Sequence, residues 1–171
     1  MAALLCALAL LCSSGVRAGT STLSASATVA SNCTIATGEL AFGSYDPIGT
    51  HRTGGANLNA SGSVSVTCIK GAAPSIALGL GANASGSIRR LKSGTSDYLN
   101  YELYKPPSTT PGAACTFPGT VVWGTAGANL FSATAAPTKA ARSYNVCGTI
   151  AAGQDPAIGT YADTVVATVT F

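Results

Sequence analysis

The chain has 171 residues, of which 47% are hydrophobic and only 9% are charged, and its formal net charge is +3. This length is most simply one domain with a substantial hydrophobic core. The sparse charge excludes a nucleic-acid-binding surface, which needs dense basic residues, and the apolar content excludes a disordered chain. The polar residues are mostly Ser, Thr, Gly and Asn, a composition that suits an exported β protein.

The first 18 residues have the layout of a secretory signal peptide. An apolar run from Ala2 to Leu11 precedes a short polar stretch, and small residues mark a cleavage site after Ala18. The run is shorter than the roughly 20 residues that a transmembrane helix needs. Cleavage of these 18 residues from 171 leaves 153, and the loss of Arg17 lowers the net charge from +3 to +2. We therefore expect an exported protein with no membrane span after cleavage.

After residue 18 the sequence predicts short β-strands between turns rich in Gly, Pro, Asn and Ser, with no convincing helix. Strict alternation of apolar and polar residues is typical of a half-buried strand. A series of such strands predicts an all-β sandwich. In chain order, the apolar positions of the expected strands are Leu23, Ala25, Ala27 and Val29; Val64, Val66 and Cys68; Ile76, Leu78 and Leu80; Leu99, Tyr101 and Leu103; Val121 to Trp123; Tyr144, Val146 and Ile150; and Val165, Ala167, Val169 and Phe171.

Long connections separate several of these strands. They span residues 46–55, roughly 81–96, 106–111 and 124–141. The second of them holds a small basic cluster, Arg89, Arg90 and Lys92, for which a solvated loop is the expected structure.

Four cysteines remain in the mature chain, and an even count in an exported protein predicts two disulfides. Cys33 and Cys68 continue the apolar faces of their strands, so a bond between them would bridge the first two strands of the domain and contribute about 4 kcal/mol in the chain-entropy model. A bond between Cys115 and Cys147 would fix the Pro-rich loop to the outer side of a strand. Other pairings stay open, since four cysteines allow three connectivities.

Chemical motifs for catalysis or metal binding are lacking in the sequence. His51 is the only histidine and no nucleophile is marked near it, so an exposed loop histidine is preferred over a general base. Widely spaced cysteines speak against a zinc site, and we expect no cofactor. Asp163, the one carboxylate inside an apolar pattern, is expected to accept hydrogen bonds near the start of the last strand. The sequence therefore predicts a protein that is not an enzyme.

Aromatic side chains are few, and a sugar-binding platform is the alternative use for them. Trp123 and the set Tyr98, Tyr101 and Tyr104 are expected to pack in the core or on a strand surface instead.

Two predicted strands at the ends of the chain have no obvious partner. Residues 160–171 stop on an apolar strand with no following segment to cover it, and residues 20–30 alternate cleanly without a turn that joins them to the domain. The N-terminal strand of one copy would then complete a groove beside the last strand of the next copy, which is donor-strand complementation. Such head-to-tail exchange does not close on itself and yields a filament.

The chain also resembles the spore coat protein U family, and the order and spacing of several motifs over the mature chain carry this resemblance. The motifs are Asn32-Cys33 followed by residues 40–46 (Leu-Ala-Phe-Gly-Ser-Tyr-Asp), Arg90-Leu91, residues 98–104, Val122-Trp123-Gly124, residues 144–154 and residues 159–165.

That family includes subunits of Csu-type, or archaic, chaperone–usher pili. The resemblance implies an incomplete immunoglobulin-like β-sandwich whose missing last strand comes from a neighbouring subunit or a chaperone. It implies related pilin subunits, a periplasmic chaperone and an outer-membrane usher as partners, and a pilus at the cell surface that serves attachment and biofilm formation. The alternatives are a carbohydrate-binding tip subunit and a structural coat protein of a spore or cyst.

On this reading the chain divides into a signal peptide (1–18), a donor strand (19–32) and a pilin domain (33–171). The donor residues are Leu23, Ala25, Ala27 and Val29, and the residues at the edge of the acceptor groove are Val165, Ala167, Val169 and Phe171.

Overall fold

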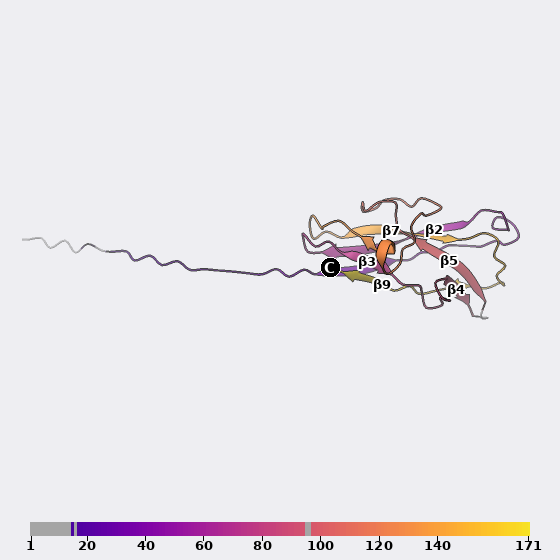
Figure 1. Ribbon diagram of the computed structural model, residues 1–171, viewed down its shortest axis with the longest axis horizontal. Coiled ribbons are helices and arrows are strands. Elements are labelled where there is room, and N and C mark those ends of the chain that lie inside the picture. The colour runs from indigo at the N-terminus through magenta and orange to yellow at the C-terminus, as the bar shows by residue number, and fades with distance from the viewer. Residues whose placement is uncertain (1–14, 16, 95–96) are drawn as a thin grey trace, which may run out of the picture.

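Two antiparallel β-sheets and a long N-terminal extension make up the computed structural model, which describes residues 15, 17–94 and 97–171 (Figure 1). The expected signal peptide falls almost wholly outside these described residues. Helix is confined, in the described part of the chain, to the single turn η1 (Gly127–Asn129). No helix of the described ranges is long and apolar enough to cross a membrane.

The larger sheet has six strands and gives the sandwich its length. Its longest pairing joins the second and seventh strands, from Leu58 opposite Ile150 to Val66 opposite Arg142. The strand order is β1-β2-β7-β5-β4-β8, and the strands are β1 (Cys33–Gly38), β2 (Leu58–Cys68), β7 (Arg142–Ile150), β5 (Tyr98–Tyr104), β4 (Arg89–Ser93) and β8 (Tyr161–Ala162).

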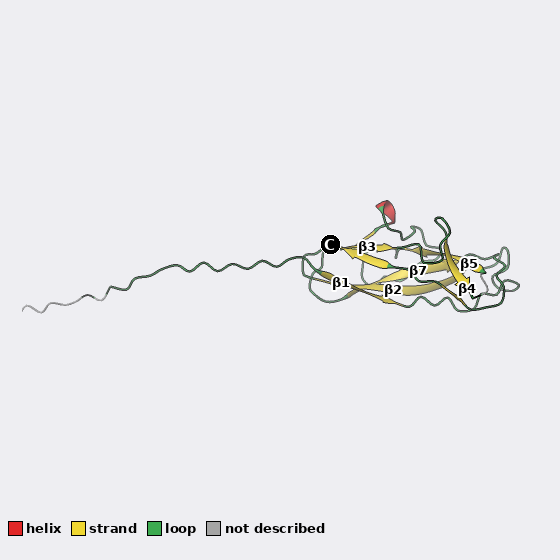
Figure 2. Cartoon of the chain, turned by 90° about the horizontal axis from the view of Figure 1, so that it is seen from below, coloured by secondary structure: helices red, strands yellow, loops and turns green. Residues whose placement is uncertain are grey.

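The smaller sheet has three strands and covers part of one face of the larger sheet, as the view turned by 90° shows (Figure 2). Its order is β6 (Phe131–Ser132), β3 (Ser75–Leu78) and β9 (Ala167–Thr170). The core lies between the two sheets because the strands alternate inward apolar and outward polar residues. Trp123 is fully buried there, as expected, and its Nε1 donates a hydrogen bond to the carbonyl of Ile76 at 2.9 Å.

Both predicted disulfides are present. Cys33 and Cys68 lie directly opposite each other in β1 and β2, so this bond fixes the edge strand to its neighbour. Cys115 bonds to Cys147 and ties the Pro-rich loop to β7.

The expected continuous strand over 160–171 is divided between the two sheets. β8 pairs with β4 in the larger sheet, whereas β9 pairs with β3 in the smaller sheet. The chain crosses from one sheet to the other over residues 163–166, where Asp163 is held by side chains of neighbouring segments. The predicted inward face is confirmed for Val165, Ala167 and Val169, which pack against the core. Phe171, predicted on the same face, is 52% exposed.

The expectation of a solvated loop over 81–96 is wrong. This segment contains β4, and Arg89 on it is fully buried. A basic residue is tolerated there because it is surrounded by acceptors, as described below. The apolar run 121–123 was expected to be a strand, but it makes only an isolated bridge between Val122 and Tyr104.

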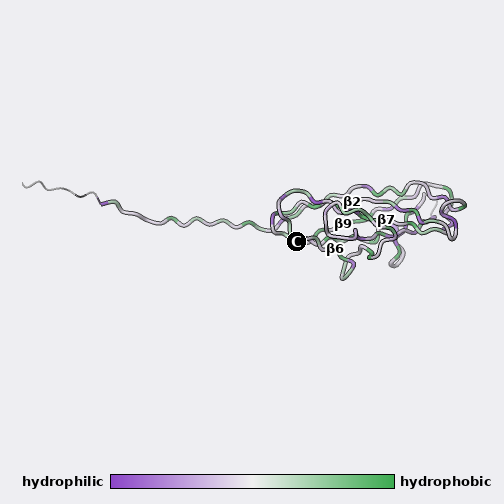
Figure 3. The backbone as a smooth tube through the Cα atoms, turned by 90° about the horizontal axis from the view of Figure 1, so that it is seen from above, coloured by the Kyte–Doolittle hydropathy of each residue, from purple (hydrophilic) through white to green (hydrophobic). Residues whose placement is uncertain are grey.

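The N-terminal extension leaves the domain at the end where the C-terminal residue lies (Figures 1 and 2). Residues 17–32 form no strand, so the strand expected over 20–30 is an extended segment without a partner in this molecule. Hydrophobic residues recur along it (Figure 3), and the two largest, Leu23 and Val29, are 95% and 78% exposed.

Candidate functional site

A groove of about 970 Å³ opens between the segment that follows β1 and the segment that joins β8 to β9. Residues 37–45 form one wall, and residues 156–165 with Ala167 form the other. The side chains at its floor are buried residues of the hydrophobic core, so the groove reaches down to the core along this line. The floor residues are Val64, Leu78, Leu99, Tyr101, Leu103, Val146 and Ile150.

Free strand edges flank this groove. β1 is the edge of the larger sheet and β9 is the edge of the smaller sheet, and the two lie close to each other. In the described part of the chain, no strand pairs with the outer side of either. Such edges present backbone N–H and C=O groups that an added strand can bind.

The first wall is fixed by close packing over two glycines. Leu40 and Phe42 lie on the larger sheet, where a Cβ on Gly148 would be 2.8 Å from Phe42 Cζ and 2.9 Å from Leu40 Cδ1. A Cβ on Gly62 would be 2.8 Å from Leu40 Cβ. The ring of Phe42 meets Tyr101 edge-on, with ring centroids 6.0 Å apart. Glycine at these two positions therefore lets the wall settle onto the sheet.

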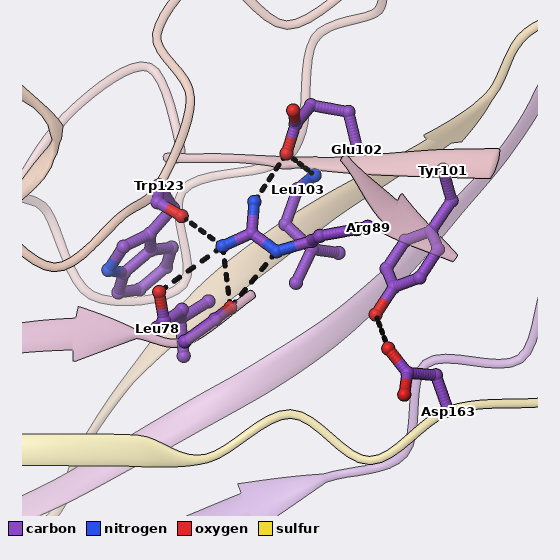
Figure 4. A network of polar contacts seen from close by, with 8 residues as sticks. Leu78, Arg89, Tyr101, Glu102, Leu103, Trp123 and Asp163 are labelled. Atoms are coloured by element: carbon purple, nitrogen blue, oxygen red, sulfur yellow. Dashed lines mark hydrogen bonds and ion pairs between the residues drawn. The ribbon is translucent and has the colours of Figure 1, made fainter. Parts of the chain in front are cut away.

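The second wall is tied to the floor by Asp163, which accepts hydrogen bonds as the sequence predicted. Tyr101 Oη donates to Asp163 Oδ2 at 2.7 Å (Figure 4). The backbone N and Nδ2 of Asn83 donate to Asp163 Oδ1 at 3.1 and 3.0 Å. Burial raises the pKa of Tyr101 well above its ordinary value, and the hydrogen bond to Asp163 and the negative charge of that carboxylate raise it further.

Beside this pair, a second polar network surrounds the fully buried Arg89 (Figure 4). Its Nη2 donates to the carbonyls of Trp123 at 2.7 Å, Gly79 at 2.8 Å and Leu78 at 3.2 Å. Its Nη1 pairs with the carboxylate of Glu102, which is 30% exposed. The guanidinium thus links β4 and β5 of the larger sheet to the end of β3 in the smaller one.

The loops of residues 46–57 and 151–160 form the mouth of the groove, at the end of the domain remote from Cys33. Tyr45 holds these two loops together. Its Oη donates to the carbonyl of Ala151 at 3.0 Å and accepts from the backbone N of Gln154 at 3.0 Å. Its ring stacks on His51 at a centroid distance of 5.0 Å. Sequence reasoning missed this role of Tyr45, since a single tyrosine in a loop gives no periodic signal.

The expectation of an exposed loop histidine is wrong. His51 is only 7% exposed, and its Nδ1 lies 2.8 Å from the carbonyl of Ala56. The loop folds back on itself, with the N–H of His51 bonded to the carbonyl of Asp46, and this buries the ring against Tyr45. The histidine is a packing element of the mouth.

Asp97 holds the second loop of the mouth, residues 151–160. Its carboxylate accepts hydrogen bonds from the backbone N of Ala157, the backbone N of Tyr98 and Tyr161 Oη. These bonds, with that from Ala157 the strongest, lower the pKa of Asp97 below its ordinary value.

The structure places the predicted site residues unevenly around this groove. Val165 and Ala167 line it, Val169 packs against the core farther along β9, and Phe171 is half exposed at the end of the chain. The extension of residues 19–32 stands away from the groove of its own molecule.

The chemistry that this arrangement offers is the binding of a peptide main chain. In the part of the chain that the structure describes, no three His, Cys, Asp or Glu residues are grouped to hold a metal ion. An apolar floor between two free strand edges is suited to one extended peptide, which would pair its backbone with the edges and place alternate side chains on the floor.

The fold and the groove together define an incomplete immunoglobulin-like β-sandwich. The chain belongs to the spore coat protein U family, since the Spore Coat Protein U domain model matches residues 19–168. It is 36% identical over 143 residues to Protein U of Myxococcus xanthus. This match covers 78% of this chain and 72% of that protein.

A solved structure shares this fold with a TM-score of 0.54 and 25% sequence identity. It is the CsuC–CsuE chaperone–tip adhesion subunit pre-assembly complex from the archaic chaperone–usher Csu pili of Acinetobacter baumannii. The match covers 84% of this chain but only 41% of the solved chain.

Proposed function

We propose that this protein is a structural subunit of a cell-surface pilus that polymerises by donor-strand exchange. The observation that carries the proposal is the groove of about 970 Å³, because it leaves the hydrophobic core open between two free strand edges. In this proposal residues 1–18 are a signal peptide, residues 19–32 are the donor strand and residues 33–171 are the pilin domain.

The sequence of the extension supports its role as the donor. Leu23, Ala25, Ala27 and Val29 share one face, and seven extended residues span about 23 Å. The groove wall of residues 37–45 is nine residues long, so a strand of this length fits beside it. Val165 and Ala167 would flank the inserted strand, with Val169 and Phe171 continuing the edge along β9.

Partners follow from the open groove, which reaches down to the core. An open core favours aggregation, so the groove needs a cover before the next subunit arrives. A periplasmic chaperone would supply that cover and an outer-membrane usher would exchange it for the next donor strand. The similarity to a subunit that was solved as a chaperone pre-assembly complex supports this route. Attachment and biofilm formation are the roles that such a pilus would serve.

Two other functions compete with this one. The 36% identity to Protein U favours a structural coat protein of a spore or cyst, in which the same groove would join coat subunits. A carbohydrate-binding tip subunit is the third candidate, and binding of the purified chain on a glycan array would support it.

Deletion of residues 19–30 tests the proposal. The shortened chain keeps the groove and the whole core, so we expect a folded subunit that co-purifies with its chaperone but forms no filaments by electron microscopy. The matched control is the full-length chain expressed from the same locus. Filaments formed by the deletion variant would contradict donor-strand exchange.

A further inference from the structure

The two ends of the domain differ in chemistry in a way that suits contact between copies. This inference rests on the proposed function, because donor-strand exchange sets which ends meet. A strand inserted antiparallel to β9 begins near the C-terminal residue Phe171 and ends at the mouth of the groove. The opposite direction would bring the donor's domain to the end from which the acceptor's own extension leaves.

The connection between donor strand and domain is short. Only residues 30–32 separate Val29 from Cys33, the first residue of β1. Four residue steps reach at most about 14 Å even when fully extended. The Cys33 end of the donor's domain must therefore lie against the loops around the acceptor's mouth.

The mouth presents two exposed isoleucines beside two carboxylates. Ile48 is 90% exposed and Ile158, which also lines the groove, is 102% exposed. They lie on the loops of residues 46–57 and 151–160. Asp46 and Asp155 on these loops are also exposed, and the one basic residue of the two loops, Arg52, donates to the carbonyl of Gly49. Both loops are internally fixed by the Tyr45 and Asp97 contacts, so the isoleucines stand on a rigid base.

The Cys33 end has the complementary character. Lys70 lies in the turn whose backbone is bonded to Asn32 and Ala136, and Lys139 lies beside Asn32 and Cys33. The segments 31–34, 67–72 and 134–141 that form this end contain no Asp or Glu. Phe171 adds an apolar ring that is 52% exposed.

We infer that consecutive copies of this chain touch end to end, with the Lys70 and Lys139 end of one subunit seated on the Ile48 and Ile158 loops of the next. The isoleucines lose their exposure to water in this contact, and the charges set its orientation. The filament is then a stack of abutting domains rather than domains joined only by their donor strands.

Site-specific photo-crosslinking in assembled filaments tests this contact. Benzoylphenylalanine replaces Ile158 in one variant and Phe117 in a matched control. Phe117 is also apolar and partly exposed, at 37%, but it lies two residues from Cys115, on the loop that the Cys115–Cys147 bond ties to β7. Filaments are irradiated, and the crosslinked peptides are mapped by mass spectrometry.

We expect the probe at Ile158 to give a ladder of crosslinked subunits, with the partner peptide falling in residues 67–72 or 134–141, and at least tenfold less of this product from the probe at Phe117. Filaments that form normally but give no such product from Ile158 would overturn the end-to-end contact and leave donor-strand exchange intact. A wild-type chain that forms no filaments at all would overturn both.

Discussion

Arg89 acts at the scale of a single residue as the polar link between the two sheets. Its guanidinium bonds three backbone carbonyls at the end of β3 and beside Trp123, and it pairs with Glu102 on β5. Such a full set of acceptors offsets the cost of burying the charge of an arginine. Because Leu78 lies in the groove floor, this link also sets the floor's position.

Replacement of Arg89 by Met keeps the volume but leaves the carbonyls and the Glu102 carboxylate without their donor. We expect a loss of about 3–5 kcal/mol in the free energy of unfolding. The measurement is urea denaturation followed by the fluorescence of Trp123, the only tryptophan. Lys92→Met on the same strand, at an exposed position, should change stability by less than about 0.5 kcal/mol. Equal effects of the two substitutions would contradict this role of Arg89.

The raised pKa of Tyr101 predicts that the protein loses stability at alkaline pH. Its pKa is raised in the folded protein, so above a pH of about 10 the unfolded state releases this proton first and stability falls as pH rises, by up to about 1.4 kcal/mol per pH unit. Tyr101→Phe removes this component, and the slope of unfolding free energy against pH above 10 should be shallower in the variant. The same slope in both proteins would show that Tyr101 does not contribute.

At the scale of elements, the two faces of the extension should differ in their effect on assembly. Leu23→Asp places a carboxylate on the face that would meet the apolar floor in the proposed function, where burial without a partner costs several kcal/mol. We expect filament yield to fall at least tenfold, with subunit stability unchanged because Leu23 is 95% exposed in the monomer. Ser24→Asp, on the opposite face, should assemble normally. The yield of sheared filaments from equal cell mass is the measurement.

The two disulfides should have different consequences. They close loops with sequence separations of 35 and 32 residues, so loss of either should cost about 4 kcal/mol by chain entropy. Only Cys33–Cys68 holds the edge strand β1, which borders the groove. We expect Cys33→Ala/Cys68→Ala to abolish filaments, whereas Cys115→Ala/Cys147→Ala destabilises the subunit but still assembles. Equal assembly defects would contradict this assignment.

Alternation of apolar and polar residues predicts the strands that bury one apolar face. It does not predict a strand whose buried residue is charged, or a strand that changes from one sheet to the other. β2, β5 and β7 were predictable because Val64, Leu103 and Val146 recur with a period of two along with their neighbours. β4 was hidden because its inward residue is Arg89, which needs acceptors that only the folded chain brings together. The division of residues 160–171 between two sheets was also hidden, since a change of sheet leaves the alternation intact.

The site was predictable in part. The odd-numbered face of the last strand and the bonds to Asp163 could be read from local pattern. The groove walls could not, because they depend on the approach of Leu40 and Phe42 to glycines far away in the chain. The burial of His51 against Tyr45 likewise comes from a loop whose fold no periodicity encodes.

At the scale of the whole molecule, the groove and the extension lie apart within one subunit, and in the proposed function a second copy brings them together. The end-to-end contact that we infer adds a second joint to that of the donor strand. Its loss should leave filaments that assemble but bend more freely, so the double variant Ile48→Ser/Ile158→Ser should show a shorter persistence length by electron microscopy. Filaments as stiff as those of the wild type would argue against this joint.

Hydrogen–deuterium exchange of the extension tests the central claim most directly. The amides of residues 22–30 should exchange rapidly in the chaperone-bound subunit and at least a hundredfold more slowly in the filament, because insertion pairs them with a neighbour's strand edges. The amides of residues 163–169 bordering the groove should keep their protection in both states. Equally rapid exchange of residues 22–30 in the filament would contradict donor-strand exchange in this protein.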